Sequence, residues 1–282
     1  MSTLTTTKRN DPCPCESGLR FKHCCGGSET QIRRLHDDPP TLVLNDTTIA
    51  GKQVIRSAAS RRVEHHGILM IEDFLSAGRC AQLVEMSRGL LSRRGRVLVV
   101  DETGGRDLVD KDAQTRITTT IKTFDIAEAV IPIVKRAFLG ELRHHYGVEF
   151  EWFEFPDILR YDPGGHYAEH NDSEVWDLKS DSWRLAEDRQ YSVLIYLNSE
   201  FAGGAVHFPE FDFTVQPKPG LLLAFPSDHR YKHAALPVES GTRYVIVSWG
   251  AVVGAKRALE GARLGVVYAS GEHVPQALQE RQ

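Results

Sequence analysis

The stretch from Tyr191 to Phe225 reads YSVLIYLNSEFAGGAVHFPEFDFTVQPKPGLLLAF, and its pattern decides the fold class. Short apolar runs alternate here with turns that contain glycine or proline. Many short strands at near-regular spacing predict an antiparallel sandwich or barrel. We therefore expect a mainly β protein. The apolar runs in this stretch are 191–197, 205–208, 211–215 and 220–225.

The same pattern continues on both sides. Apolar runs occur at Asp157–Tyr161 and at Arg243–Trp249, and each lies next to a turn that contains glycine. A jelly roll, also called a double-stranded β-helix, accounts for all of these strands with the fewest assumptions.

Helices are expected to flank this core. The run Gly67–Leu75 predicts a strand, and Ser76 is a good N-cap for a helix that follows it. The segment from Ile126 to Tyr146 predicts a second helix, and the polar segment 108–122 is interpreted as an irregular arm over a site. Apolar positions at helical spacing are Cys80, Leu83, Val84, Leu90 and Leu91 in the first helix, and Ile126, Val130, Val134, Phe138 and Leu142 in the second.

Three residues on this predicted scaffold form a candidate metal site. His170 and Asp172 are two positions apart, so their side chains point the same way on a strand or extended loop. His233 would complete a facial triad of two histidines and one carboxylate, which is typical of non-haem Fe(II) and leaves coordination positions open. The pair alone is a weak signal, because roughly one His-x-Asp is expected by chance in such a chain.

The residues around these positions resemble the Fe(II)/2-oxoglutarate-dependent oxygenases of the prolyl 4-hydroxylase-like branch. Their pattern is R-Y-x-x-G-x-x-Y-x-x-H-x-D, then Y-L-N, G-G-x-x-x-F-P, a P-x-x-G turn into L-x-F, and H-x-x-x-P-V-x-x-G-x-R-Y-x-x-x-x-W. The match covers about residues 63–250. Its positions in this chain are Arg160, Tyr161, Tyr167, His170, Asp172, Tyr196, Leu197, Asn198, Gly203, Gly204, Phe208, Pro209, Gly220, Phe225, His233, Arg243 and Trp249.

This resemblance implies a dioxygenase that depends on Fe(II) and 2-oxoglutarate. His170, Asp172 and His233 would be the iron ligands. The implied reaction uses O2 to hydroxylate an unactivated C–H bond and releases succinate and CO2, with ascorbate as a candidate reductant. Because this chemistry belongs to the metal and the cosubstrate, no catalytic residue beyond the metal site is expected.

The resemblance also implies a 2-oxoglutarate site. Arg243 would pair with the C5 carboxylate, and guanidinium geometry suits that bidentate contact. Collagen-type members have lysine at this position, so Arg243 points towards other members. Tyr161 and Tyr196 match tyrosines that hydrogen-bond 2-oxoglutarate. Aromatic packing in the core is the alternative interpretation for both tyrosines.

A cysteine cluster with the spacing C-x-C-x8-C-C lies near the N-terminus. A closed site of four thiolates suits structural zinc, although His23 could replace one of the adjacent cysteines. Redox-active or merely solvated cysteines are the alternative. The segment resembles the SEC-C motif, which starts C-P-C-x-S-G and ends C-[CH]-G. Under that resemblance the zinc ligands are Cys13, Cys15, Cys24 and Cys25.

The distribution of charge also separates the N-terminal segment that contains the cysteines from the rest of the chain. Its 282 residues carry a net charge of −4, which argues against a mainly electrostatic nucleic-acid or membrane binder. Residues 1–35 are basic, and the remainder is acidic. The first ten residues contain no secretory signal, so a cytoplasmic location is expected. The expected divisions are a zinc module at 1–30, a linker or lead-in at 31–62, an oxygenase domain at 63–254 and a C-terminal tail at 255–282.

Three functional hypotheses follow. The favoured one is a hydroxylase of a protein side chain, with proline as the first candidate and the zinc module recruiting a macromolecular partner. The second is the same oxygenase chemistry on a small molecule. The third is a catalytically silent adaptor that binds through the zinc module, and a complete triad with an intact Arg243 argues against it. No membrane partner is expected.

Overall fold

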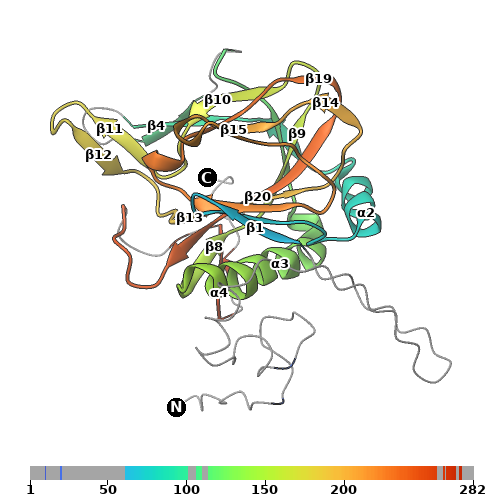
Figure 1. Ribbon diagram of the computed structural model, residues 1–282, viewed down its shortest axis with the longest axis horizontal. Coiled ribbons are helices and arrows are strands. Elements are labelled where there is room, and N and C mark those ends of the chain that lie inside the picture. Colours follow the sequence, from blue (N-terminus) through green and yellow to red (C-terminus); the bar gives the residue numbers. More distant parts are fainter. Residues whose placement is uncertain are drawn as a thin grey trace, which may run out of the picture.

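The computed structural model describes residues 61–100, 106–109, 114–258, 263, 265–270 and 273–274, and the isolated positions 10 and 20. This part of the chain is mainly β, with helices packed against one wall of the strands (Figure 1). No helix within it is both long and apolar enough to cross a membrane. The antiparallel β fold with flanking helices, which the sequence predicted, is therefore observed.

The large sheet forms one wall of the fold, and all of its pairs are antiparallel. Its strands are β1 (Arg62–His65), β2 (Ile68–Ile71), β3 (Ser92–Arg94), β7 (Thr119–Lys122), β8 (Phe150–Glu154), β9 (Asp157–Tyr161), β13 (Tyr191–Tyr196), β17 (Leu222–Pro226), β20 (Arg243–Val252), β21 (Val266–Tyr268) and β22 (His273–Val274). Their order is β1-β2-β17-β13-β20-β8-β21-β22. In addition β9 pairs with β20, β7 with β9 and β3 with β7.

A smaller sheet faces this wall and carries the candidate site. Its order is β16-β15-β18-β10-β6, with β6 (Arg116–Ile117), β10 (His166–His170), β15 (Val206–Phe208), β16 (Phe213–Val215) and β18 (His233–Ala235). Three two-stranded ribbons complete the β structure. They are β4 (Val97–Val100) with β5 (Arg106–Val109), β11 (Glu174–Asp177) with β12 (Ser182–Leu185), and β14 (Phe201–Gly203) with β19 (Val238–Gly241).

Side chains of the large sheet alternate between two apolar cores. On β13, Val193 and Ile195 belong to the core that the helices cover. Leu194 and Tyr196 belong to the core that contains residues of the small sheet, such as Phe208. Because successive side chains of a strand point to opposite faces, this double alternation fixes which residues line the space between the sheets.

The first helix, α2 (Ala77–Ser87), begins where the sequence predicted. The Ser76 side chain accepts a hydrogen bond from the Arg79 backbone N–H and so caps the helix. The expectation that the helix extends to Leu90 and Leu91 is wrong, although Leu90 still packs against the helix-covered core from outside the helix. The backbone leaves the helix after Ser87, Gly89 has a φ of +80°, and Leu91 is 68% exposed.

The second helical segment is built from four pieces: η2 (Phe124–Ile126), α3 (Ala127–Lys135), the π-helical η3 (Arg136–Leu142) and α4 (Arg143–Tyr146). Its predicted apolar stripe is buried throughout. A stripe spaced by four residues rotates by about 40° per step on an ideal α-helix. The wider π turn of η3 offsets this rotation, so Phe138 and Leu142 stay on the buried side.

Two segments are more regular than the sequence indicated. Within the expected arm, Arg116–Ile117 and Thr119–Lys122 are strands, because threonine and Ile121 suit a pleated, half-buried surface. In the expected C-terminal tail, Val266–Tyr268 pairs with β8 and extends the large sheet.

Candidate metal centre

Two predicted ligands lie next to each other on neighbouring strands of the small sheet. His170 ends β10, His233 begins β18, and the two are register partners with ring centroids 4.4 Å apart. The His233 ring packs against Phe208 and Phe225 of the core between the sheets. A register shift between Tyr167 and His170 gives β10 a bulge. The rings of Tyr167 and His170 stack with their centroids 3.6 Å apart.

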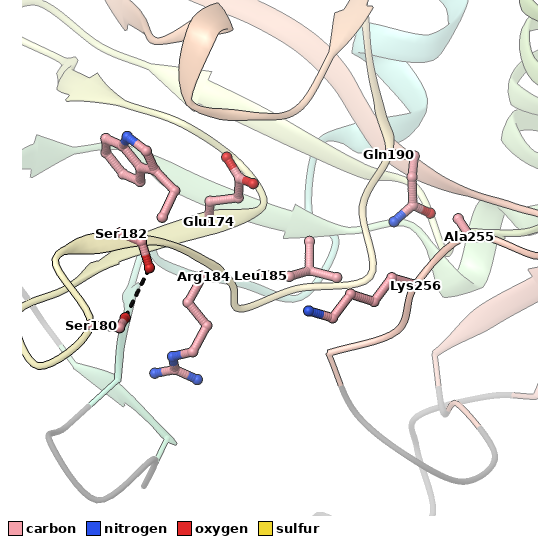
Figure 2. Close-up of a pocket in the computed structure, with 9 residues that line it drawn as sticks. Glu174, Ser180, Ser182, Arg184, Leu185, Gln190, Ala255 and Lys256 are labelled. Carbon is pink, nitrogen blue, oxygen red and sulfur yellow. Dashed lines mark hydrogen bonds between the residues drawn. The ribbon is translucent and has the colours of Figure 1, made fainter.

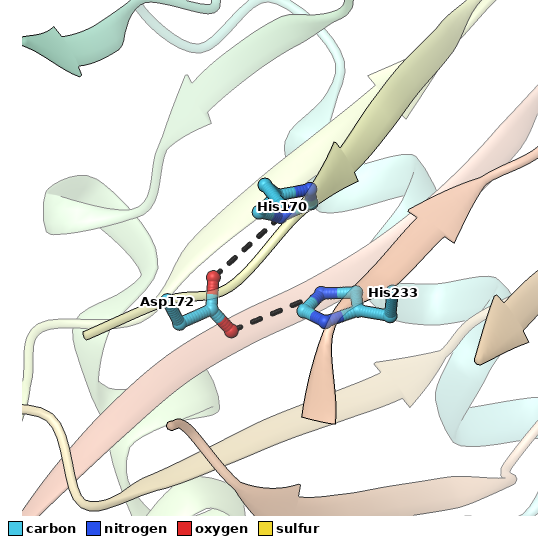
Figure 3. Close-up of side chains that lie close together, drawn as sticks. All are labelled: His170, Asp172 and His233. Atoms are coloured by element: carbon cyan, nitrogen blue, oxygen red, sulfur yellow. Dashed lines mark ion pairs between the residues drawn. The ribbon is translucent and has the colours of Figure 1, made fainter. Parts of the chain in front are cut away.

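Asp172, the third predicted ligand, lies two residues beyond the end of β10. Its carboxylate points towards both imidazoles (Figure 3). Oδ1 is 3.6 Å from Nε2 of His170, and Oδ2 is 3.8 Å from Nε2 of His233. One potential ligand atom from each residue lies within 4.8 Å of the others, so the three side chains can hold a single metal ion.

The hydrogen bonds of the two histidines leave Nε2 of each ring available to bind a metal. Nδ1 of His170 lies 2.8 Å from the carbonyl oxygen of Ala168, and Nδ1 of His233 lies 3.1 Å from that of Tyr231. A carbonyl oxygen only accepts hydrogen bonds, so Nδ1 of each ring carries the proton and donates it. The lone pair of each neutral ring is then on Nε2, which faces Asp172.

The electrostatics of the cluster favour the same protonation states. Burial, followed by the neighbouring His233, lowers the pKa of His170 to about 3. Burial opposes ionisation of Asp172, but the positive charges of His233 and His170 in their protonated forms, together with that of Arg189, outweigh it and lower its pKa to about 2. A neutral imidazole beside a carboxylate is the donor set that a divalent metal needs, so these residues fit Fe(II).

Several supporting residues had no role assigned from the sequence. Ser192 donates a 2.6 Å hydrogen bond to Oδ2 of Asp172. Arg189 forms a two-point ion pair with Glu154 at 2.5 and 2.9 Å, and its guanidinium carbon lies 4.0 Å from the centroid of a Trp249 ring. A single serine within an apolar strand was the only signal for Ser192 in the sequence.

The residues predicted to bind 2-oxoglutarate lie on three strands of the large sheet: Tyr161 ends β9, Tyr196 ends β13 and Arg243 begins β20. Arg243 is only 1% exposed, donates a hydrogen bond to the carbonyl oxygen of Gly204, and lies over the ring of Tyr161 at 3.9 Å. Tyr196 is fully buried on β13, and burial raises its pKa. Ser192 and Tyr196 point to the same face of β13, about 13 Å apart along the strand.

Two polar atoms in this group fit an anionic ligand. Nε of Arg243 and the hydroxyl of Tyr196 are buried, and neither has a hydrogen-bond partner in the described part of the chain. Buried donors without partners are costly, so their pairing with a carboxylate would be favourable. The residues present therefore fit a dicarboxylic acid such as 2-oxoglutarate.

A second group of potential ligands is already engaged in local contacts. Glu174 accepts hydrogen bonds from the backbone N–H of His229 at 2.9 Å and lies 2.7 Å from its Nδ1. Asp228 caps η5 (His229–Tyr231) and forms a two-point ion pair with Arg230. The ring of His229 also stacks on Trp183 at 4.8 Å. This group holds the β11–β12 ribbon against the loop that leads to His233.

Two surface grooves of about 480 and 490 Å³ share Trp183 as a lining residue. The first runs along the ribbon towards Gln190 and Lys256 (Figure 2). The second lies beside His229 and Lys232, the residue next to His233. Each groove therefore has a lining residue close in sequence to a candidate metal ligand. Glu174 in the first groove follows Asp172 by two positions, and Lys232 in the second precedes His233.

The four cysteines of the predicted zinc module lie outside the described residues, as does His23. The expected division at residue 30 and most of the expected linker at 31–62 also lie there. Their assignment rests on the spacing of the cysteines in the sequence.

The chain was compared with known families and proteins. Residues 156–250 match the model of the 2OG-Fe(II) oxygenase superfamily, and residues 9–27 match the SEC-C motif. A provisionally named prolyl 4-hydroxylase of Acanthamoeba polyphaga mimivirus is 34% identical over 128 residues, which cover 42% of this chain and 52% of that protein. Prolyl 4-hydroxylase subunit alpha-2 of Gallus gallus is 33% identical over 114 residues, 36% of this chain and 20% of that protein.

Among solved structures, a viral collagen prolyl hydroxylase of Paramecium Bursaria Chlorella virus-1 aligns with a TM-score of 0.46 and 22% identity. That alignment covers 66% of this chain and 97% of the viral chain. The chain spans about half the length of the mimivirus protein and a fifth of the chicken subunit.

Proposed function

We propose, from the premise that residues 156–250 form a 2OG-Fe(II) oxygenase domain related to prolyl hydroxylases, that this chain hydroxylates proline in a protein substrate. The observation that carries the proposal is the cluster of His170, Asp172 and His233, in which both Nε2 atoms face one carboxylate. In that reaction Fe(II) and 2-oxoglutarate would activate O2, so that one oxygen atom converts a C–H bond to C–OH and the other enters the succinate formed, with CO2, from 2-oxoglutarate.

The residues of the chain have separate parts in this proposal. His170, Asp172 and His233 would hold iron through neutral imidazoles and a carboxylate. Arg243 and Tyr196 would pair their partnerless polar atoms with the far carboxylate of 2-oxoglutarate. The core around Phe208 and Phe225 keeps bulk water away from the His233 ring, which is a condition for controlled oxidation.

The surroundings of the cluster support a peptide substrate over a small molecule. The β11–β12 ribbon begins two residues after Asp172, and it exposes Trp176 by 45% and Leu178 by 82%. Apolar side chains exposed beside two grooves suit contact with an extended chain. A small molecule would not need such exposed apolar side chains outside the site.

The N-terminal segment adds a second part to the proposal. Residues 9–27 match the SEC-C motif, and we propose that Cys13, Cys15, Cys24 and Cys25 bind structural zinc there. The module would recruit the macromolecular partner, since it lies outside the oxygenase domain.

Reconstitution with Fe(II) under anaerobic conditions, followed by 2-oxoglutarate and O2, tests the proposal. Proline-containing peptides and protein extracts are offered as substrates, succinate is measured, and mass spectrometry detects the addition of one oxygen atom. His170→Ala should abolish both signals. His207→Ala is the matched control, because His207 lies on the same sheet and its Nδ1 contacts Thr214 instead.

Oxygen found on a proline residue that His170→Ala leaves unmodified would support the proposal. Oxygen found only on small molecules would assign the chain to the alternative substrate class. Absence of succinate from the intact protein with every substrate, despite bound iron, would refute catalysis.

A further inference from the structure

Two buried serines form a chain of hydrogen bonds that ends at the carboxylate of the candidate metal ligand Asp172. The hydroxyl of Ser192 lies 2.6 Å from Oδ2 of Asp172 and 2.8 Å from the hydroxyl of Ser227. Ser192 is fully buried, and Ser227 is 1% exposed. Burial of a hydroxyl is costly unless it is hydrogen-bonded, so these contacts are needed for either serine to be tolerated at its position.

The direction of the two hydrogen bonds follows from proton counting. Ser192 donates its single proton to the carboxylate oxygen Oδ2 of Asp172. Ser192 then has no proton left for Ser227, and Ser227 must donate to it. The result is a relay from Ser227 to Ser192 to Asp172, in which each hydrogen bond polarises the next.

The start of the relay is fixed to the backbone on two sides. The N–H of Ser227 donates to the carbonyl oxygen of Gln190 at 3.0 Å. The carbonyl oxygen of Ser227 accepts from the N–H of Asp172 at 3.2 Å and from the hydroxyl of Ser173 at 2.9 Å. Ser227 therefore holds the main chain of Asp172 as well as, through Ser192, its side chain.

We propose that Ser192 and Ser227 are positioning residues for Asp172, and this inference rests on the proposed function in which Asp172 binds iron. The relay occupies Oδ2 and orients the carboxylate towards the two Nε2 atoms. Oδ1 receives no hydrogen bond from any residue that the structure describes. The relay thus presents Asp172 through one free oxygen and opposes rotation of the carboxylate away from the metal.

The affinity of the protein for Mn(II), a redox-inert substitute for Fe(II), tests the relay without any turnover. Loss of a group that orients a metal ligand typically weakens metal binding by about 10- to 100-fold. We expect Ser192→Val to show such a loss, measured from the signal of free Mn(II) in electron paramagnetic resonance. Threonine has nearly the same shape as valine but keeps the hydroxyl, so Ser192→Thr should bind Mn(II) with close to the wild-type affinity.

Ser248→Ala is the matched control. Ser248 is also fully buried, it is the register partner of Val193 on the neighbouring strand β20, and its hydroxyl donates to the carbonyl oxygen of Glu154. It should bind Mn(II) like the wild type. Ser227→Ala should weaken binding in the same direction as Ser192→Val but less, because Ser192 retains its own bond to Asp172.

The outcomes separate the relay from the proposed function. Equal Mn(II) affinity in Ser192→Val and Ser192→Thr would overturn the relay, and if His170→Ala still abolishes binding the metal site would stand. A wild-type protein that binds neither Mn(II) nor Fe(II) would overturn both. Circular dichroism and Tm, measured for the Val and Thr variants together, show whether both are equally folded, so any difference in affinity between them belongs to the hydroxyl.

Discussion

Arg243 lies directly opposite Tyr161 on neighbouring strands, with its guanidinium carbon 3.9 Å from the centroid of the Tyr161 ring. An arginine buried to this extent needs compensation for its lost hydration. The aromatic face supplies part of it, and the carbonyl oxygen of Gly204 supplies one hydrogen bond. A second donor of the guanidinium, the buried Nε, stays without a partner in the described structure, which indicates where an anion would bind.

Replacement of Arg243 by alanine should therefore affect 2-oxoglutarate far more than the metal. Removing one side of a buried charge pair costs about 2–5 kcal/mol, so the KM for 2-oxoglutarate should rise by roughly a hundredfold. Mn(II) affinity should change little. Steady-state kinetics and Mn(II) titration measure the two quantities, and a larger effect on the metal would remove the assigned role.

Tyr196→Phe should have opposite effects on stability and on ligand binding. Without ligand, the change removes a buried hydroxyl that has no partner among the described residues, so the free energy of unfolding should rise by about 1 kcal/mol. The affinity for 2-oxoglutarate should fall by about tenfold, because a hydrogen bond to the carboxylate is lost. Urea unfolding and calorimetric titration measure these effects. A destabilised variant with unchanged affinity would favour simple core packing.

Zinc and iron should be lost independently. In Cys13→Ser/Cys15→Ser the proposed zinc module loses two thiolates, so zinc should disappear while Fe(II) still binds. Elemental analysis of the purified protein measures both metals. Cys80→Ala is the control, because Cys80 is buried in the helix-covered core and belongs to neither metal site. Simultaneous loss of both metals would contradict two separate sites.

Gly220→Ala should destabilise the fold by several kcal/mol. Gly220 has a φ of +79°, and a Cβ there would collide with the carbonyl oxygen of Leu75. Gly78→Ala is the contrasting case, because the position lies in α2 with open space around it. That change should stabilise by up to about 1 kcal/mol. Thermal unfolding of both variants checks the prediction, and equal Tm values would refute it.

The sequence predicted those strands whose side chains face an apolar core. Asp157–Tyr161 is a strand with the predicted bounds, and β13 and β20 differ from prediction only at their C-terminal ends. The sequence left the ligand-bearing segment β10 open as a strand or an extended loop, because its sequence His-Tyr-Ala-Glu-His faces a polar site and lacks apolar alternation. A strand that faces a polar site therefore lacks the alternating apolar pattern from which strands are predicted.

The candidate site was predictable in part for a related reason. The histidines and the aspartate have ligand chemistry that a spacing can reveal, and the structure brings them together. Ser192 and Ser227 have no such mark, because a serine in an apolar strand is ordinary until its neighbours in space are known. Their contact with Asp172 arises from packing between segments that are distant in the sequence, which no local pattern encodes.

The cluster joins segments that meet only in the assembled fold. His170 and His233 come from the small sheet, whereas Ser192 comes from the large one. A partly folded chain in which the sheets have not closed on each other lacks the hydrogen bond from Ser192 to Asp172. Metal binding would therefore be tightest once the hydrogen bond from Ser192 to Asp172 joins the two sheets, and added Fe(II) or Mn(II) would raise the free energy of unfolding because the metal binds the folded state.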